Sequence, residues 1–127
     1  MSMFYRSTRD DNVKVTASQA ILKGLAADGG LFVPESIPSL DKSLEELSKM
    51  NYKEVAYEVM KLMLDDFTEE ELKSCIDRAY DSKFDTEEMT PLVKVENEYF
   101  LELFHGATIA FKAVSYTHLR AHETRRH

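Results

Sequence analysis

Apolar residues recur at helical spacing through the middle of the chain, and this periodicity constrains the fold more than any other feature of the sequence. It predicts three acidic, amphipathic helices, the first over residues 41–49 and the second beginning near Asn51. The third is expected to begin at Thr68, because a threonine followed three residues later by Glu71 forms a capping box. The apolar faces of the second and third helices comprise Tyr52, Val55, Ala56, Val59, Leu62, Met63, Leu72, Ile76, Ala79 and Tyr80.

Extended segments are expected on both sides of these helices. Residues 4–7 predict a short strand, and a capping box of Thr16 with Gln19 opens a helix that ends within 24–30. Residues 31–33 then resume an extended conformation. Beyond the third helix, Pro91 breaks the helical pattern. The two predicted strands that follow are 92–95 and 99–104, joined by a turn at Asn97.

Composition excludes several classes of partner. The net charge of −7 argues against nucleic acid or an anionic membrane as the main partner. Charges near the N-terminus interrupt any signal-peptide core, and no apolar run approaches membrane-spanning length, so we expect a cytoplasmic protein. The single cysteine, Cys75, excludes an internal disulfide and is expected to be buried among the apolar residues of its helix.

Two polar clusters each allow a ligand site and a plainer interpretation. The Asp28-Gly29-Gly30 run could bring backbone N–H groups to a phosphate, with help from Ser7, Thr8 and Arg9, but an ordinary turn is favoured. The acidic residues within 65–71 could bind a metal. They lack the central glycine and alternating ligands of a calcium loop, so solvated helix caps are favoured and no metal site is expected.

A lysine at a loop-to-helix junction carries the strongest chemical signal. Thr108 is a plausible N-cap, which would place Lys112 in the first turn of the following helix. The positive end of the helix dipole disfavours an ammonium ion there, and nearby apolar side chains could strip water from it. Both effects favour the neutral amine that attacks a carbonyl carbon. The plain alternative is a solvated surface lysine. The apolar neighbours are Phe104, Ile109 and Phe111.

The sequence changes character after this lysine. Residues 113–127 hold three of the four histidines, carry a net positive charge and lack apolar periodicity. The run 115–124 resembles translated adaptor sequence that ends many unrelated fragmentary reading frames. We expect this tail to be non-native and exclude it from the fold prediction.

Several motifs, in their order and spacing, resemble the N-terminal part of the threonine synthase family, within the tryptophan-synthase-β-like class of pyridoxal-phosphate enzymes. The likeness spans residues 4–112. It departs at Ala107, where many members have proline, and at Ala113, where an aspartate usually follows the lysine. The motifs are Tyr5-Arg6-Ser7-Thr8-Arg9, the run 18–34 containing Asp28-Gly29-Gly30-Leu31-Phe32-Val33-Pro34, Tyr57, Pro91-Leu92 and the run 102–112 containing His105-Gly106-Ala107-Thr108-Ile109-Ala110-Phe111-Lys112.

The resemblance implies a cofactor and its attachment point. In that family the lysine matching Lys112 carries pyridoxal phosphate as a Schiff base, and the freed amine then serves as general base and acid. We also expect His105, Thr108 and Phe111 to lie against the cofactor, although His105 could equally serve only to shape the loop. No metal ligand is implied.

The resemblance also implies an α/β fold and a reaction. The chain would be a small sheet with packed helices, truncated before the main cofactor-binding domain. Its division would be 1–90 for the N-terminal domain, 91–112 for the start of the catalytic domain and 113–127 for the tail. The implied parent is a carbon-oxygen lyase that converts O-phospho-L-homoserine and water to L-threonine and phosphate.

The isolated chain is expected to be inactive, because the glycine-rich phosphate loop and most of the pocket are missing. Two alternatives stay open at this point. One is a stand-alone acidic helical interaction module without catalysis. The other is a sister pyridoxal-phosphate lyase with a different amino-acid substrate.

Overall fold

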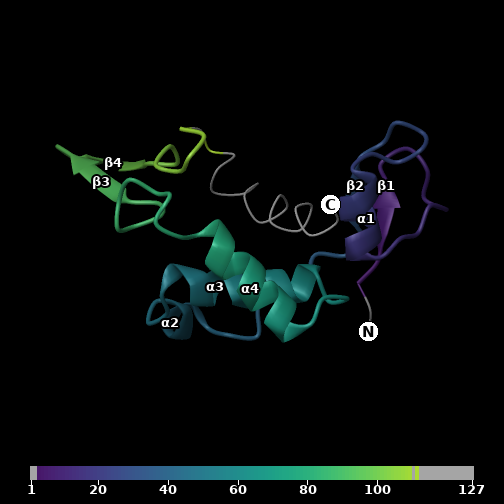
Figure 1. Cartoon of the computed structure of the whole chain (residues 1–127), viewed down its shortest axis with the longest axis horizontal. Coiled ribbons are helices and arrows are strands. Elements are labelled where there is room, and N and C mark those ends of the chain that lie inside the picture. The colour runs from purple at the N-terminus through teal and green to yellow at the C-terminus, as the bar shows by residue number, and fades with distance from the viewer. Residues whose placement is uncertain (1–2, 110, 112–127) are drawn as a thin grey trace. The chain divides into compact units, whose positions relative to one another are not determined.

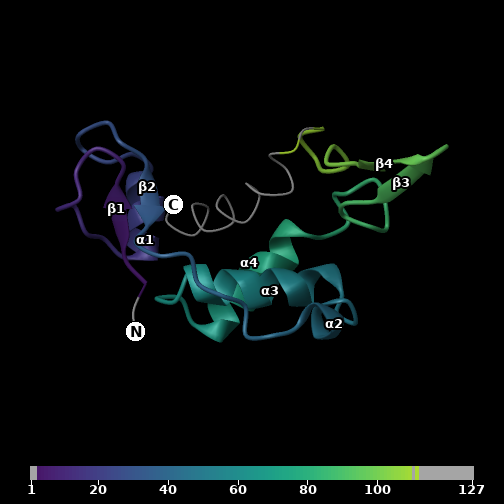
Figure 2. The same ribbon diagram turned by 180° about the vertical axis from the view of Figure 1, so that it is seen from behind.

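The computed structural model describes residues 3–109 and residue 111 of the 127-residue chain. Contacts divide the chain into two compact units, Met1–Lys73 and Ser74–His127, with the boundary inside the last helix (Figures 1 and 2). The fold is α/β, with two separate two-stranded antiparallel sheets in the described residues. In chain order the elements are β1 (Tyr5–Ser7), α1 (Ala17–Lys23), β2 (Phe32–Pro34), α2 (Leu44–Leu47), α3 (Tyr52–Met63), α4 (Glu69–Ala79), β3 (Leu92–Val95) and β4 (Glu98–Leu101).

The first sheet joins β1 to β2. Tyr5 pairs with Pro34 and Ser7 with Phe32, and an isolated bridge adds Val15 beside Tyr5. Figure 1 shows α1 lying next to this ribbon. The buried apolar residues here are small, which allows the helix to approach the strands closely; they are Val15, Ala17, Ala20 and Ala26.

Helix α1 begins and ends as its sequence predicts. The Thr16 side chain accepts a hydrogen bond from the Gln19 amide, and the Gln19 side chain accepts one from the Thr16 amide, which completes the capping box. The helix ends at Gly24, whose φ of 70° is readily adopted by glycine. The predicted strand, cap and stop are therefore confirmed.

A carboxylate far along the chain also caps α1. Asp66 accepts hydrogen bonds from the Ser18 amide at 3.0 Å and from the Ser18 hydroxyl at 2.6 Å. Nearby, the Tyr5 hydroxyl donates to the Met63 carbonyl at 2.7 Å, and Asp65 accepts from the Met3 amide at 2.6 Å. These acidic residues therefore tie the end of α3 to β1 and α1. Among the described residues, no group of acidic, histidine or cysteine side chains is arranged to hold a metal ion.

Helix α2 is shorter than predicted. It covers only Leu44–Leu47, whereas the sequence pattern predicted 41–49. The difference arises because Ser43 and Glu46 form a reciprocal capping box, which fixes the start of the helix after Ser43. The helix then ends at Ser48, just before the next cap.

Helices α3 and α4 start at the predicted residues. Asn51 and Glu54 cap α3 reciprocally, and Thr68 and Glu71 do the same for α4. Within the first unit, the Lys73 ammonium on α4 lies 5.2 Å from the centre of the Tyr57 ring on α3. The buried residues along and after α4 follow helical spacing and are Leu72, Ile76, Ala79, Tyr80 and Phe84.

Cys75 differs from its prediction. It is only half-buried, and an Arg78 guanidinium nitrogen lies 3.6 Å from its sulfur. The reason is its position one residue before Ile76, which places it beside the most buried line of the helix instead of on it.

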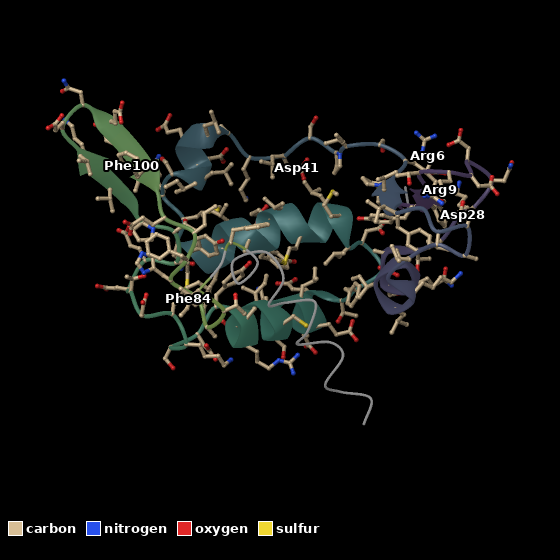
Figure 3. All side chains as sticks on the ribbon, turned by 90° about the horizontal axis from the view of Figure 1, so that it is seen from above. Arg6, Arg9, Asp28, Asp41, Phe84 and Phe100 are labelled. Carbon is tan, nitrogen blue, oxygen red and sulfur yellow. The ribbon has the colours of Figure 1, made fainter. Side chains whose placement is uncertain are left out.

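The second sheet is the predicted hairpin. Leu92 pairs with Leu101 and Val93 with Phe100, and Glu96 takes a φ of 55° in the turn. Strand β4 ends at Leu101 instead of continuing to 104. Apolar side chains occupy both faces of the ribbon, and every residue of both strands is exposed, including Phe100, labelled in Figure 3.

The Asp66 cap predicts a specific acid sensitivity. Burial alone raises the pKa of Asp66, but hydrogen bonds from Ser18 and Thr16 outweigh it and hold the pKa below its usual range. Its stabilising contribution is therefore present above about pH 4, near the unfolded pKa, and is lost as pH falls through the lower folded pKa. Asp66→Ala should cost about 1 kcal/mol at neutral pH and flatten this acid limb in urea unfolding.

A matched substitution separates the cap from general charge removal. Asp11 forms a surface ion pair with Arg6 at 3.0 Å, so Asp11→Ala should change the free energy of unfolding by less than about 0.5 kcal/mol. Equal effects of the two substitutions would refute the assigned role of Asp66.

The hairpin predicts self-association of this chain. An exposed ribbon with apolar faces and unpaired edges favours pairing with other copies. We expect the average mass in sedimentation to rise with concentration and Phe100→Lys to suppress the rise. Ile37→Lys, at an even more exposed apolar site in the first unit, should not. A strictly monomeric wild-type chain at high micromolar concentration would contradict this.

Candidate functional site

The predicted site lies in the segment after β4. Its lysine, Lys112, lies outside the described residues, whereas His105, Thr108 and Phe111 lie within them. Residues 102–105 have no regular secondary structure and lead to the buried Gly106, where the chain turns. Three of the four predicted site residues can therefore be placed.

The helix expected to start at Thr108 does not begin there. The Ile109 amide donates to the Gly106 carbonyl at 2.9 Å, and Ile109 has a φ of 52°. A helix capped by Thr108 would need a helical, negative φ at Ile109, so the N-cap prediction was wrong. A tight turn from Gly106 to Ile109 takes the place of the helix start. Because the Ile109 side chain is 79% exposed, its packing does not favour a helical conformation there.

The apolar side chains near the lysine are open to solvent. Phe104 is about half exposed and Phe111 is 63% exposed. They were expected to strip water from the lysine, but among the described residues they do not form an enclosed apolar wall. They present aromatic surface on which a planar ring can lie.

His105 is the most firmly held residue of the segment. Its Nδ1 lies 2.6 Å from Asp85 Oδ1 and its Nε2 lies 2.7 Å from Glu102 Oε2. The Asp85 amide donates to the His105 carbonyl at 3.1 Å, and the Phe104 ring centre lies 4.6 Å from the imidazole centre. The side chain is only 12% exposed.

These carboxylates favour the protonated imidazole. The hydrogen bond with Glu102 is the main cause that raises the pKa of His105. Burial opposes it, and the bond and charge of Asp85 reinforce it. The sequence pattern did not indicate Asp85, because it precedes His105 by 20 residues and follows α4, whereas His105 follows β4.

The Asp28-Gly29-Gly30 run forms the ordinary turn that was favoured. Both Asp28 carboxylate oxygens accept from the Ser7 hydroxyl at 2.8 Å, and one also accepts from the Gly30 amide at 2.8 Å. Arg9 donates to the Asp28 carbonyl at 3.0 Å, and Figure 3 shows these two residues beside each other. A carboxylate thus takes the donors that a phosphate would need. The backbone bond from Gly30, followed by that from Ser7, lowers the pKa of Asp28.

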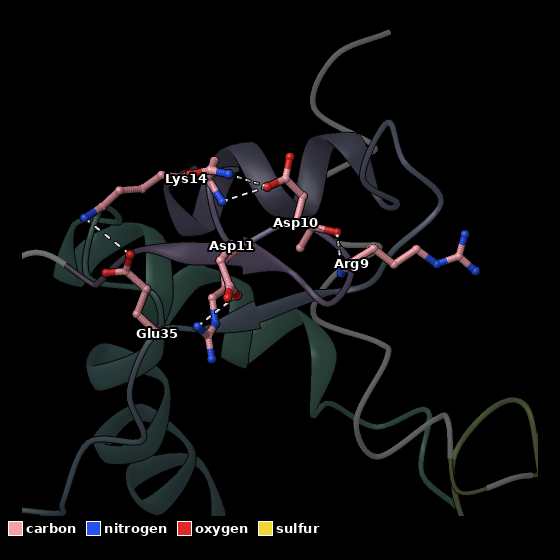
Figure 4. Close-up of polar contacts among 8 residues, drawn as sticks. Arg9, Asp10, Asp11, Lys14 and Glu35 are labelled. Atoms are coloured by element: carbon pink, nitrogen blue, oxygen red, sulfur yellow. Dashed lines mark hydrogen bonds and ion pairs between the residues drawn. The ribbon is translucent and has the colours of Figure 1, made fainter.

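Neighbouring groups in the first unit are also paired internally. Thr8 accepts from the Leu31 amide at 3.0 Å. Lys14 pairs with Glu35 at 3.3 Å, as Figure 4 shows, and its ammonium lies 4.4 Å from the Phe4 ring centre. Lys14, Glu35 and Phe4 line a groove of about 610 Å³ that the sequence did not indicate. The Lys14 ammonium and the Glu35 carboxylate neutralise each other in this groove.

Comparison with known proteins identifies the family. The family described as Threonine synthase N terminus matches residues 4–80, more than half of the chain. The chain belongs to the threonine synthase family. Threonine synthase of Saccharomyces cerevisiae is 41% identical over 124 residues, an alignment that covers 90% of this chain and 24% of that protein.

Solved threonine synthases have the same fold in the matched region. The crystal structure of threonine synthase from yeast superposes with a TM-score of 0.81 at 37% identity, covering 91% of this chain and 25% of that one. A pyridoxal-phosphate-bound threonine synthase from Brucella melitensis gives 0.79 at 36% identity, covering 93% and 26%. The chain thus spans about a quarter of the length of these threonine synthases.

The match to the N-terminal family, unlike the alignments to whole threonine synthases, covers only one of the two clusters described above. The matched residues 4–80 contain the Ser7–Asp28 turn but stop before the His105 segment. The described part of the chain has no helix that is long and apolar enough to cross a membrane.

The turn predicts that Gly30 cannot be replaced. A Cβ built on Gly30 would lie 2.1 Å from the Ser7 hydroxyl oxygen, and Ser7 is buried at 1% exposure. We expect Gly30→Ala to lower the free energy of unfolding by about 2–3 kcal/mol, because the clash cannot be relieved without breaking the Ser7–Asp28 bonds.

Gly24 provides the matched control. A Cβ there meets nothing within 4 Å, but φ is +70°. Gly24→Ala should therefore cost about 1–2 kcal/mol, from the strain of a γ-turn backbone alone. If thermal unfolding showed Gly30→Ala to be no more costly than Gly24→Ala, the packing argument would fail.

Proposed function

We propose that this chain is the N-terminal segment of a threonine synthase, a pyridoxal-phosphate-dependent carbon-oxygen lyase. The complete enzyme would convert O-phospho-L-homoserine and water to L-threonine and phosphate. The observation that carries the proposal is the similarity to threonine synthases over about nine-tenths of the chain, at 41% identity to the Saccharomyces cerevisiae protein. The substrate would be a small molecule, and the predicted location is the cytoplasm.

The residue types around Lys112 suit one end of pyridoxal phosphate. A lysine amine can hold an aldehyde covalently, and the exposed Phe104 and Phe111 rings can flank a pyridine ring. The charged side chains bonded to His105 are both carboxylates, so the described part of this segment offers no cationic cradle for the phosphate group. A Brucella melitensis relative is described as pyridoxal-phosphate-bound, which supports this cofactor for the family member proposed here.

Each predicted site residue then has a role. Lys112 holds the cofactor, and its freed neutral amine takes and returns protons at the substrate's α and β carbons. Phe111 and Thr108 orient the cofactor end next to the lysine, while His105 lies at the base of the segment. When bound, pyridoxal phosphate supplies the electron sink for this chemistry.

The 127-residue chain alone is expected to be inactive. It spans about a quarter of its relatives, and the predicted catalytic part, 91–112, is only the start of a cofactor-binding domain. The division at residue 90 and the non-native tail 113–127 stay predictions. Without the remaining sequence, the phosphate and the substrate lack most of their binding groups.

The test uses the complete protein from the source locus and compares Lys112→Ala with Lys94→Ala, a surface lysine on β3. Lys112→Ala should abolish both the visible absorbance of lysine-bound pyridoxal phosphate and threonine formation, a loss of at least about a thousandfold. Lys94→Ala should retain both, and the 127-residue chain should form no threonine.

Three results would decide against the proposal. Retained threonine formation in Lys112→Ala would remove the lysine from catalysis. Wild-type protein that binds the cofactor but ignores O-phosphohomoserine would favour a sister lyase. A complete protein that binds no pyridoxal phosphate would favour an interaction module.

A further inference from the structure

Both ring nitrogens of His105 are occupied by carboxylates. Nδ1 contacts Asp85 at 2.6 Å and Nε2 contacts Glu102 at 2.7 Å. A neutral imidazole carries a single N–H, so one of the two short contacts would then place a lone pair against a carboxylate oxygen. The observed geometry, with a carboxylate at each nitrogen, favours the doubly protonated imidazolium, which donates an N–H to each carboxylate.

The imidazolium connects parts of the second unit that are distant in sequence. Glu102 directly follows β4, and Asp85 directly follows the buried Phe84 after α4. The backbone contact from the Asp85 amide to the His105 carbonyl joins the same two segments. The buried Gly106 comes next, so His105 fixes the origin of the segment that leads to Lys112.

We propose that His105 is a positioning residue, an imidazolium clamped between Glu102 and Asp85 that holds the lysine-bearing segment in place and releases it when deprotonated. The clamp itself does not depend on the proposed function; only its effect on catalysis does. It also excludes a hydrogen bond from His105 to the cofactor while the clamp is closed, because neither ring nitrogen is free.

The two halves of the clamp are unequal. The Glu102 side chain is 27% exposed, whereas that of Asp85 is 75% exposed. Water competes better for Asp85, so the Nδ1 proton facing it is the one lost when pH rises. The other ring contact is the uncharged Phe104, so Glu102 and Asp85 are the titratable groups that face His105 among the described residues.

The first experiment follows the protonation of His105 in the full 127-residue chain by NMR, with His105→Gln identifying its resonance. We expect a pKa above the ordinary value of about 6.5. Glu102→Gln should lower the pKa more than Asp85→Asn, because Glu102 is the stronger partner. Glu87→Gln removes the same charge from an exposed site two residues from Asp85 and should leave it nearly unchanged.

The second experiment measures hydrogen-exchange protection of residues 106–111, corrected for intrinsic exchange rates. Protection should fall by about tenfold as pH rises through the His105 pKa, and Asp85→Asn should move this fall to lower pH. Glu87→Gln should behave as the wild type. A His105 pKa at or below the ordinary value would overturn the clamp. So would exchange protection that does not change as pH passes through the His105 pKa.

The catalytic consequence is tested in the complete enzyme. Asp85→Asn should shift the alkaline limb of the kcat–pH profile downward, and Asp85→Glu should restore it, because a carboxylate is regained. An active enzyme whose alkaline limb is the same in Asp85→Asn would overturn the positioning role alone. An inactive wild type would refute the proposed function, while NMR and exchange would still decide whether the clamp exists.

Discussion

The turn of the first unit depends on one carboxylate, that of Asp28, which binds hydrogen-bond donors of the protein itself. The Asp28 carboxylate accepts hydrogen bonds from the buried Ser7 hydroxyl and from the Gly30 amide, and these bonds fix the turn against the end of β1. The pairing of β1 with β2 continues directly from this point, through Ser7 and Phe32. Because Gly30 has no side chain, the turn can approach Ser7 closely, and a Cβ there would lie 2.1 Å from its hydroxyl. Strand pairing and turn geometry therefore share a single constraint.

Local patterns predicted most of the elements because their determinants lie within a few residues. The reciprocal caps at Thr16, Asn51 and Thr68 each join residues three apart, so the sequence alone displays them. The bond between Asp66 and Ser18 spans 48 residues and has no local signature. Helix α2 was misjudged for a different reason: its cap at Ser43 is local, but the apolar spacing suggested a longer helix than this cap permits.

The identity of the site residues stays a prediction, whereas the conformation of their segment differs from the one expected. The resemblance of residues 102–112 to a known family selected Lys112 and His105, whereas the capping pattern at Thr108 indicated a helix start that the Gly106–Ile109 turn replaces. Most helical stability in proteins comes from packing of an apolar face, and Ile109 and Phe111 are exposed here. The partner Asp85 was invisible to sequence reasoning because tertiary structure brings it to His105.

The charges around His105 also indicate what this segment cannot do by itself. Two carboxylates carry two negative charges against the single positive charge of the imidazolium, so the described base of the segment is net negative. A phosphate group is repelled by such a site, whereas a lysine ammonium is stabilised by it. Under the proposed function, a neutral, nucleophilic Lys112 would depend on phosphate-binding and desolvating groups from the three-quarters of its relatives that this chain does not span. Under the proposed function, the segment supplies the position of the amine, and the missing domain must supply its reactivity.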